Sequence, residues 1–289
     1  IQVVRARVDA YFENQHISKK YNQAMILKTI IMLTAYILPF FIYLYNNPSI
    51  PISLALWAIM ALGMSGIGMC IMHDANHNAY TSSHKLNQIL GYSINLAGAF
   101  AFNWKIQHNV LHHTYTNITH YDDDIDDKAI LKLSPHTQVK WYHRYQYIYA
   151  FIFYSIATLY WTFIKDFLQF FRYKNEGLNK NSFSENSLIL IRLILTKILY
   201  LFIVLYIPYI YFGIPLQKTV LCFTFMHLIA GLVLTTIFQL AHTIVGTEHP
   251  LPNENLIIEN DWAVHQMNTT ANFAKNSKFI TWYIGGLNY

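Results

Sequence analysis

Two groups of histidines repeat a spacing that suits metal binding. The segment MHDANHNAY places His73 and His77 four residues apart, and NWKIQHNVLHHTYTN repeats that spacing with His108 and His112 and adds His113. Residues four apart on a helix lie on one face, one turn from each other. Imidazole binds iron, copper and zinc alike, but five histidines exceed the three or four that one zinc ion uses. The two groups therefore predict a site for two metal ions.

Three later histidines are further candidates. The last apolar segment ends FQLAHTIVG, and we expect His242 at its end to be a sixth ligand. His265, in DWAVHQMNTTANFA, keeps three roles open: a ligand, a hydrogen-bond partner of a ligand, or a surface residue. His227 lies 15 residues before His242, about 22 Å along a helix, so both cannot bind one site. For His227 we expect a neutral, packed or channel-lining role.

An acidic run, HYDDDID, begins at His120. Such a run is usually a solvated loop. The alternative is that one or more of Asp122, Asp123 and Asp124 accept the spare N–H of a ligating imidazole and so fix its tautomer. Both interpretations stay open at this stage.

The composition indicates a protein that meets lipid. Of the 289 residues, 54% are hydrophobic and 12% charged, whereas about a quarter of the residues of a soluble domain are charged. The two cysteines, Cys70 and Cys222, fall in apolar runs and are expected to be small core residues rather than a disulfide or a zinc site. The net charge of +5 fits contact with anionic headgroups or an acidic partner, although solvation alone also explains it, and no nucleic-acid partner is predicted.

Four segments are apolar over the roughly 20 residues needed to cross a bilayer: 25–45, 52–72, 193–212 and 219–241. Arg192 and Lys197 place the start of the third at the membrane interface. Two further stretches, 86–103 and 146–171, are interrupted by polar residues. If either crossed alone, the bilayer would separate the histidine groups. We therefore expect both to be helices in the interface, where Tyr and Trp are favoured.

The basic residues predict the orientation. Ten of the 20 lie between Lys85 and Lys180, and five precede position 29. By the positive-inside rule, both termini and the long central loop are cytosolic. The expected fold is a single domain over 1–289, an all-α integral membrane protein with four transmembrane helices, two interfacial helices and a cytosolic helical cap that carries the histidines.

These motifs resemble the membrane fatty-acid desaturase family. Its pattern is H-D-x-x-H after a second span, H-x-x-x-H-H after an interfacial helix, and a third histidine box after the last span. The likeness extends over almost the whole chain, through HDANH, HNVLHH with TNITHYDDDID, and HQMNTTANFA. These segments are similar to a bacterial acyl-CoA branch related to front-end, linoleoyl-CoA type desaturases.

The resemblance implies an oxidoreductase with two iron ions and dioxygen as co-substrate. Removing hydrogens from an unactivated methylene is beyond any side-chain acid or base, so a cofactor must supply that chemistry. The implied substrate is a fatty-acyl chain carried by CoA or by a lipid, and the implied location is a bacterial inner membrane. The implied iron ligands are His73, His77, His108, His112, His113 and His242.

In that branch the segment GGLNY is followed by Q-x-E-H-H, which supplies further iron ligands. The sequence ends at Tyr289 of GGLNY, so we expect these 289 residues alone to be inactive. No heme-binding H-P-G-G precedes the first span, and we expect electrons from a separate cytochrome or ferredoxin.

Two other functions stay open. A lipid hydroxylase or ketolase of the same architecture uses similar histidine boxes, although the HNVLHH and TTANF details favour desaturation. A histidine-based metal transporter would place its ligands near the middle of the membrane, where only His227 lies. The sequence does not specify the position of the new double bond or the chain length of the substrate.

Overall fold

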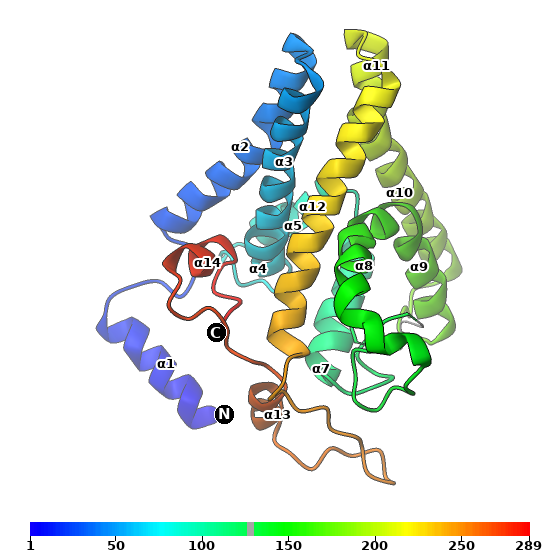
Figure 1. The fold of residues 1–289 in the computed structure, drawn as a ribbon. Coiled ribbons are helices and arrows are strands. Elements are labelled where there is room, and N and C mark those ends of the chain that lie inside the picture. Colours follow the sequence, from blue (N-terminus) through cyan, green and yellow to red (C-terminus); the bar gives the residue numbers. More distant parts are fainter. Residues whose placement is uncertain (126–129) are drawn as a thin grey trace.

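The computed structural model describes residues 1–125 and 130–289, which form helices and no strand (Figure 1). Turns of 3₁₀ type (η2, η4) and π type (η1, η3, η5, η6) interrupt the α-helices. The elements are α1 Gln2–Asn14, α2 Gln23–Asn46, α3 Ile50–Gly66, η1 Ile67–Met72, α4 His73–Asn76, α5 His84–Gly91, η2 Tyr92–Ala97, α6 Ala101–Lys105, η3 Ile106–His112, α7 His113–Tyr115, η4 Trp141–Tyr145, α8 Gln146–Tyr160, η5 Trp161–Lys165, α9 Asp166–Asn175, α10 Phe183–Leu201, η6 Phe202–Tyr206, α11 Ile207–Phe212, α12 Leu216–His242, α13 Trp262–Asn268 and α14 Lys278–Tyr283.

Five helical segments are long and apolar enough to cross a membrane: Gln23–Asn46, Ile50–Asn76, Trp141–Asn175, Phe183–Phe212 and Leu216–His242. Four of them contain the four predicted spans. The other, Trp141–Asn175, contains the predicted interfacial helix 146–171, so one more segment qualifies as a span than was expected. Over the described residues, the protein is therefore an all-helical membrane protein with five candidate spans.

The second predicted interfacial helix, 86–103, differs from the expectation because it is not one helix. The helix α5 continues into η2, and the chain then turns at Gly98, whose φ is +76°. A side chain at Gly98 would meet Tyr200 and Thr162, so glycine allows the turn to pack closely. Beyond it, the Asn95 side chain accepts a hydrogen bond from the backbone N–H of Ala101 at the start of α6. The polar residue that interrupted the apolar pattern thus stabilises the turn.

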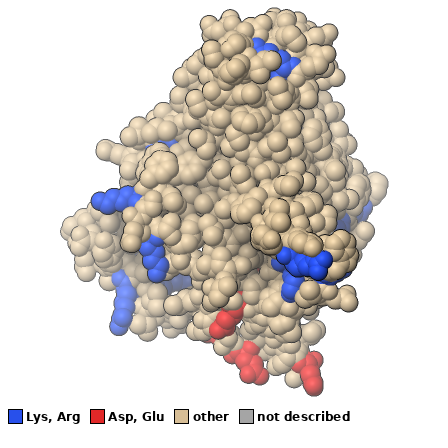
Figure 2. All heavy atoms as spheres, viewed as in Figure 1, with Lys and Arg blue, Asp and Glu red and all other residues tan. Residues whose placement is uncertain are grey.

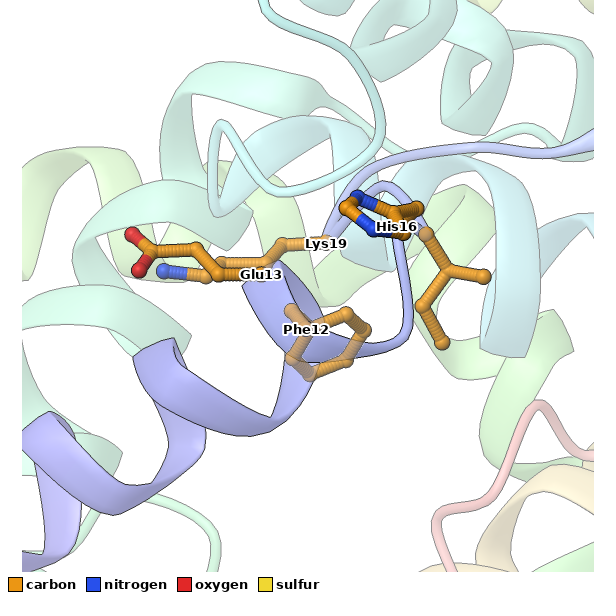
Figure 3. Close-up of a pocket in the computed structure, with 5 residues that line it drawn as sticks. Phe12, Glu13, His16 and Lys19 are labelled. Atoms are coloured by element: carbon orange, nitrogen blue, oxygen red, sulfur yellow. The ribbon is translucent and has the colours of Figure 1, made fainter.

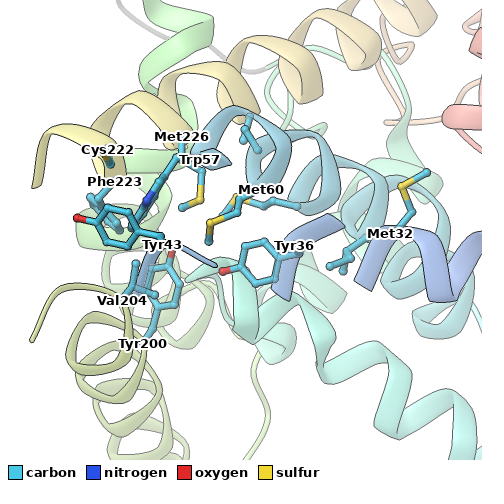
Figure 4. Close-up of a cluster of buried hydrophobic side chains, with 14 of the residues drawn as sticks. Met32, Tyr36, Tyr43, Trp57, Met60, Tyr200, Val204, Cys222, Phe223 and Met226 are labelled. Carbon is cyan, nitrogen blue, oxygen red and sulfur yellow. The ribbon is translucent and has the colours of Figure 1, made fainter. Parts of the chain in front are cut away.

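Aromatic and methionine side chains fill the interior between α2, α3, α10 and α12 (Figure 4). Trp57 is fully buried and packs edge-on against Tyr43. Gly63 lies against the backbone of Tyr36 in α2, and Gly231 lies against the carbonyl of Ser155 in α8. Small residues let helices approach closely within a bilayer, so these two glycines bring α2 onto α3 and α8 onto α12.

The outer surface is largely apolar. Leucine, isoleucine and phenylalanine side chains are exposed along α2, α8 and α10. In Figure 2 a broad belt without charged atoms separates basic residues near the top from the basic and acidic residues lower down. Such a belt fits the hydrocarbon layer of a membrane.

The long helix of α8, η5 and α9 is packed into the bundle rather than lying flat. The hydroxyl of Thr158 donates to the carbonyl of His227 at 2.7 Å, which attaches α8 to α12. Lys197, which was expected at the membrane interface, is buried in α10 and forms an ion pair with Asp166 at 2.5 Å. That expectation was wrong because a lysine stem can reach a buried carboxylate as well as the headgroups.

The N-terminal helix α1 lies apart from the bundle, on the same side as α13 and α14 (Figure 1). Beside it is an open pocket of about 500 Å³ (Figure 3). It is lined by α1 and the loop that follows, including Phe12, Glu13 and the exposed His16. None of the histidines predicted to bind metal lines this pocket.

Candidate metal centre

Two helical segments bring five of the six predicted ligands to one end of the bundle. The run α3–η1–α4 carries His73 and is followed directly by His77, and α6–η3–α7 carries His108, His112 and His113. His73, His77, His108 and His113 each offer a ring nitrogen within 4.8 Å of the others. The Nε2 atom of His108 lies 3.1 Å from the Nε2 atoms of both His73 and His113. The spacing seen in the sequence therefore produces one cluster.

A π turn precedes or contains each histidine group. η1 ends at Met72, directly before His73, and η3 contains His108 and His112. Such turns widen a helix locally and are frequent at functional sites. Trp104, in the helix that leads into η3, stacks on the ring of His108 with centroids 4.4 Å apart. The indole thereby restricts the orientation of this imidazole.

The cluster fits a metal ion in two respects. Two imidazole nitrogens bound to one metal at about 2.0–2.1 Å lie about 3 Å apart when they bind at right angles, close to the separations seen here. The Nε2 atom of His77 is buried and has no hydrogen-bond partner. A buried polar atom without a partner costs about 1–3 kcal/mol, and a bound metal would satisfy it.

The protonation of the cluster also fits. Burial, followed by the neighbouring His73 and His113, lowers the pKa of His77 to about 3. Burial and His112 lower the pKa of His113 to about 4, and burial lowers the pKa of His108 well below its usual value. These imidazoles are therefore neutral at physiological pH, which is the form that binds a metal.

A second group adjoins the first through His108, which offers a ligand atom to both. Its other members are His112 and Asp124. The Nδ1 atom of His112 lies 3.0 and 3.1 Å from the two carboxylate oxygens of Asp122, which leaves Nε2 for a metal. Burial opposes protonation of His112, but the bond to Asp122 and the charges of Asp122 and Asp124 outweigh it and raise its pKa.

His242, at the end of α12, packs against His112 of this second group. Its ring centroid lies 4.6 Å from that of His112, and the rings are nearly perpendicular. Its Nδ1 atom lies 3.3 Å from the backbone carbonyl of Thr269, an acceptor that holds the proton on Nδ1. As in His112, the other ring nitrogen remains for a metal.

The three aspartates have different surroundings. Asp122 lies within hydrogen-bond distance of Nδ1 of His112, the contact that the tautomer-fixing interpretation requires. Asp123 faces α9 instead, where it pairs with Arg172 at 2.5 Å and accepts from the Tyr173 hydroxyl at 2.7 Å. Asp124 accepts from the Gln107 side chain, and burial raises its pKa.

The other two candidate histidines, His265 and His227, form hydrogen bonds away from the cluster. The Nε2 atom of His265 donates to the carbonyl of Thr116 at 2.8 Å, beneath the turn that follows the second histidine group. His227 packs inside the bundle, with Nε2 at 2.8 Å from the Tyr200 hydroxyl and Nδ1 at 3.1 Å from the Thr158 hydroxyl. Both of its nitrogens are paired, as the packed role predicted.

The model of the family described as "Fatty acid desaturase" matches residues 48–289. The sn-1 linoleoyl-lipid 6-desaturase of Arthrospira platensis is 34% identical over 98% of this chain and 76% of the relative. The enzyme of the same description from Synechocystis is 32% identical over 100% of this chain and 80% of the relative. An acyl-lipid (8-3)-desaturase of Physcomitrium patens is 33% identical over 99% and 59%. No solved structure matches the chain.

The chain belongs to the fatty acid desaturase family. This confirms the resemblance read from the histidine motifs, including its front-end type. The protein is thus an oxidoreductase that desaturates fatty-acyl chains, and the metal-transporter alternative is discarded. The family membership also agrees with metal- and oxygen-dependent chemistry at the clustered histidines.

Sequence reasoning missed several side chains that support the desaturase site. Gln107 donates to Asp124, and Gln169 in α9 donates to the carbonyl oxygen of the Gln107 side chain at 2.7 Å. Asn117 contacts three separate chain segments. Gln107 and Asn117 lie within or directly after the second histidine motif, and that proximity was the available signal. Gln169 carried no signal because its contact joins residues 62 positions apart.

Proposed function

We propose that this desaturase holds two irons and uses dioxygen to introduce a double bond into an acyl chain carried by a membrane lipid. The observation that carries the proposal is the convergence of neutral imidazoles, one of which has a buried nitrogen without a partner. In this proposal His73, His77 and His113 hold one iron, His112 and His242 hold the other, and His108 lies between them.

The two irons, when bound, supply with dioxygen the oxidising power that removes two hydrogens from adjacent methylenes. Dioxygen takes four electrons in forming two waters, and the substrate provides two of them. The other two must come from a reductant, and we propose a separate cytochrome or ferredoxin as the donor. The chain's own residues orient the ligands: Asp122 holds the proton of His112 on Nδ1, and the Thr269 carbonyl does the same for His242. Trp104 shields one side of His108.

The substrate proposal rests on the relatives. Two of them are described as acting on a linoleoyl lipid and one on an acyl lipid. We infer that this enzyme also acts on a lipid-linked chain that already contains a double bond. Acyl-CoA is the alternative carrier. Offering the enzyme an acyl lipid and an acyl-CoA together would show which of the two it desaturates.

The test is product analysis with the full-length protein in a membrane that contains linoleoyl lipids and a reductant system. The expected product is a chain with one additional double bond, with about two irons per protein. His84→Ala is a suitable control variant because His84 is an exposed histidine outside the cluster. Hydroxylated chains alone would favour the hydroxylase alternative, and zinc in place of iron would contradict the proposal.

We further propose four membrane crossings, a single domain and a cytosolic metal centre. The contacts between α8 and α12 pair increasing residue numbers in α8 with decreasing residue numbers in α12. Ser155 lies near Gly231, and Thr158 lies near His227. The contacts between α9 and α10 follow the same order, with increasing residue numbers in α9 paired with decreasing residue numbers in α10. Asp166 pairs there with Lys197, and Phe170 packs against Leu193.

α10 and α12 are joined by a short connection and run in opposite directions. Trp141–Asn175 is one continuous helix that contacts α12 with its first half and α10 with its second. We propose that it lies obliquely across these two helices at one end of the bundle and does not cross the membrane. This returns the count of crossings to four and keeps both histidine groups on one face.

Single cysteines test this topology, because both native cysteines are buried. Gln138→Cys and Asn181→Cys lie at exposed positions on either side of the segment, and Asn47→Cys lies in the turn between α2 and α3. An impermeant thiol reagent should label the first two from the cytosolic side and the third from the other. Labelling of Gln138→Cys and Asn181→Cys from opposite sides would show that the segment crosses.

A further inference from the structure

Asn117 is a fully buried residue in the turn after the second histidine group. Its φ is +58°, a left-handed conformation that asparagine tolerates better than most residues. Its side-chain nitrogen lies within hydrogen-bond distance of three backbone carbonyls: that of His242 at 2.8 Å and those of Glu248 and Thr269 at 3.1 Å each. One amide thus connects the second histidine group to the end of α12 and to the segment after α13.

Two of these contacts lead to the orientation of imidazoles. The Thr269 carbonyl that accepts from Asn117 is the same carbonyl that accepts from Nδ1 of His242. The backbone N–H of Asn117 donates at 2.9 Å to Oδ2 of Asp122, the oxygen that also accepts from Nδ1 of His112. Asn117 therefore contacts the orienting acceptor of both His112 and His242.

We propose that Asn117 is a positioning residue that sets the orientation of His112 and His242 together. Those rings lie 4.6 Å apart and belong to one of the two proposed iron positions. The residue type follows from the contacts: an amide nitrogen donates to carbonyls, whereas the carboxylate of an aspartate would repel all three and the nearby Asp122. The inference rests on the proposed di-iron function.

Two substitutions separate the side chain from the backbone. Asn117→Gly keeps access to the left-handed conformation and removes only the amide. Asn117→Asp keeps the shape and replaces the donor by acceptors. The control for aspartate is Asn47→Asp, because Asn47 is an exposed asparagine with φ +39° at the opposite end of the bundle. The control for truncation is Asn268→Ala, because Asn268 links to Glu248 by an exposed side-chain bond.

The measurements are made on the purified full-length enzyme: iron per chain, the Mössbauer spectrum, and hydrogen exchange of residues 243–269. For Asn117→Gly we expect affinity at one iron position to fall about 10- to 100-fold, as for other residues that support a ligand. One iron signal should change while the other is retained, and exchange should rise in 243–269. Asn117→Asp should show a larger effect, and both controls should keep the iron content and the iron signals of the wild type.

A role limited to folding would lower thermal stability while leaving both iron signals unchanged in the folded protein, and that result would overturn the inference. If both variants fail to fold, hydrogen exchange of the wild type still provides a test. Fast exchange of the backbone N–H of Asn117 would contradict its hydrogen bond to Asp122. A double-mutant cycle of Asn117→Gly with Asp122→Asn should be less than additive, since both weaken the one iron position that His112 and His242 are proposed to hold. A wild-type enzyme without two irons would instead contradict the proposed function.

Discussion

Two buried groups of ionisable residues use their hydrogen-bonding capacity in opposite ways. At the metal centre, His77 keeps a buried nitrogen without a partner, and the Nε2 atoms of His73 and His108 lie only 3.1 Å apart. In the middle of the bundle, His227 pairs one nitrogen with the Tyr200 hydroxyl and the other with Thr158. The first arrangement leaves a nitrogen that a bound cation would satisfy, whereas the second is complete within the protein.

The ion pair near His227 is also complete. Nζ of Lys197 contacts the carboxylate of Asp166 and the carbonyls of Gly98 and Trp161, so its three N–H groups have three acceptors. Asp166 also accepts from the indole of Trp161 and the amide of Asn103. Burial alone therefore does not identify a functional histidine or charge. The comparison teaches that a buried nitrogen without a partner points to a ligand where several imidazoles converge around it, as at His77, whereas His227 has two partners and, among the described residues, no neighbouring imidazole cluster.

The strongest test of this comparison is His108→Ala, because His108 belongs to both ligand groups. We expect both iron positions to weaken, with an affinity loss greater than the roughly 10- to 100-fold caused by loss of a supporting contact. Desaturation should become undetectable while the protein still inserts into the membrane. The exposed His84→Ala should retain iron and activity. Full iron content in His108→Ala would disprove the assignment of this cluster.

A smaller effect is expected from Asp122→Asn, which leaves all imidazoles in place. The substitution removes the charge that holds the proton of His112 on Nδ1. Iron affinity should fall about 10- to 100-fold. Asp9→Asn, at an exposed ion pair with Lys19, serves as the control and should have no effect on iron. If Asp122→Asn binds iron as the wild type does, the acidic run only forms a loop.

The sequence predicted the cluster because its signal is local. The four-residue spacing of His73 and His77, and of His108 and His112, needs only helical geometry. Four spans were also recognisable from uninterrupted apolar runs. Each of these features is contained within about 20 consecutive residues, so no knowledge of tertiary contacts was required.

The misjudged features depend on contacts between distant segments. Lys197 looked like an interfacial residue because its partner Asp166 lies 31 positions away. The segment 146–171 was expected to lie in the interface because a lone crossing would separate the histidine groups, and its interruption by Asp166 gave no sign that this residue is fully buried and paired. Asn117 reaches carbonyls 125 to 152 positions away. A hydropathy scale counts each of these polar residues as unfavourable to burial, because it does not include the distant residue that pairs with it.

The ion pair provides a test within the structural region. Lys197→Met leaves Asp166 buried without its cation, and loss of one partner of a buried pair costs about 3–5 kcal/mol. We expect lower thermal stability but an unchanged ratio of iron to protein. The double variant Lys197→Met with Asp166→Leu should recover part of the loss. Lys19→Met, in an exposed pair, should cost at most about 1 kcal/mol. Loss of iron in the folded Lys197→Met protein would show that the two regions are coupled.

His227→Phe should have a smaller effect on stability. It leaves the hydroxyls of Tyr200 and Thr158 without their imidazole partner, which costs about 1–3 kcal/mol for each group left unsatisfied. Thr158 still donates to the carbonyl of residue 227, so we expect the lower end of that range. Iron content and product should be unchanged. If the folded His227→Phe protein lost iron, the separation of His227 from the metal centre would be contradicted.

The smallest predicted effect is the pH dependence of the metal-free protein. The pKa values of His77 and His113 lie at about 3 and 4, below the value near 6.5 of an unfolded histidine, and that of His108 is also lowered. Between these values the unfolded chain binds protons that the folded chain does not, so stability falls as pH decreases below about 6.5. His112, whose pKa is raised, opposes this trend and limits its size. After iron is removed by a chelator, the unfolding temperature should therefore decrease modestly from pH 7.5 to pH 5.5. The unfolding temperature of the iron-loaded protein should change less, because its ligands cannot take up protons until the metal leaves. An unfolding temperature of the metal-free protein that rises from pH 7.5 to pH 5.5 would mean that the cluster is protonated in the folded state, which would contradict neutral imidazoles ready to bind a metal.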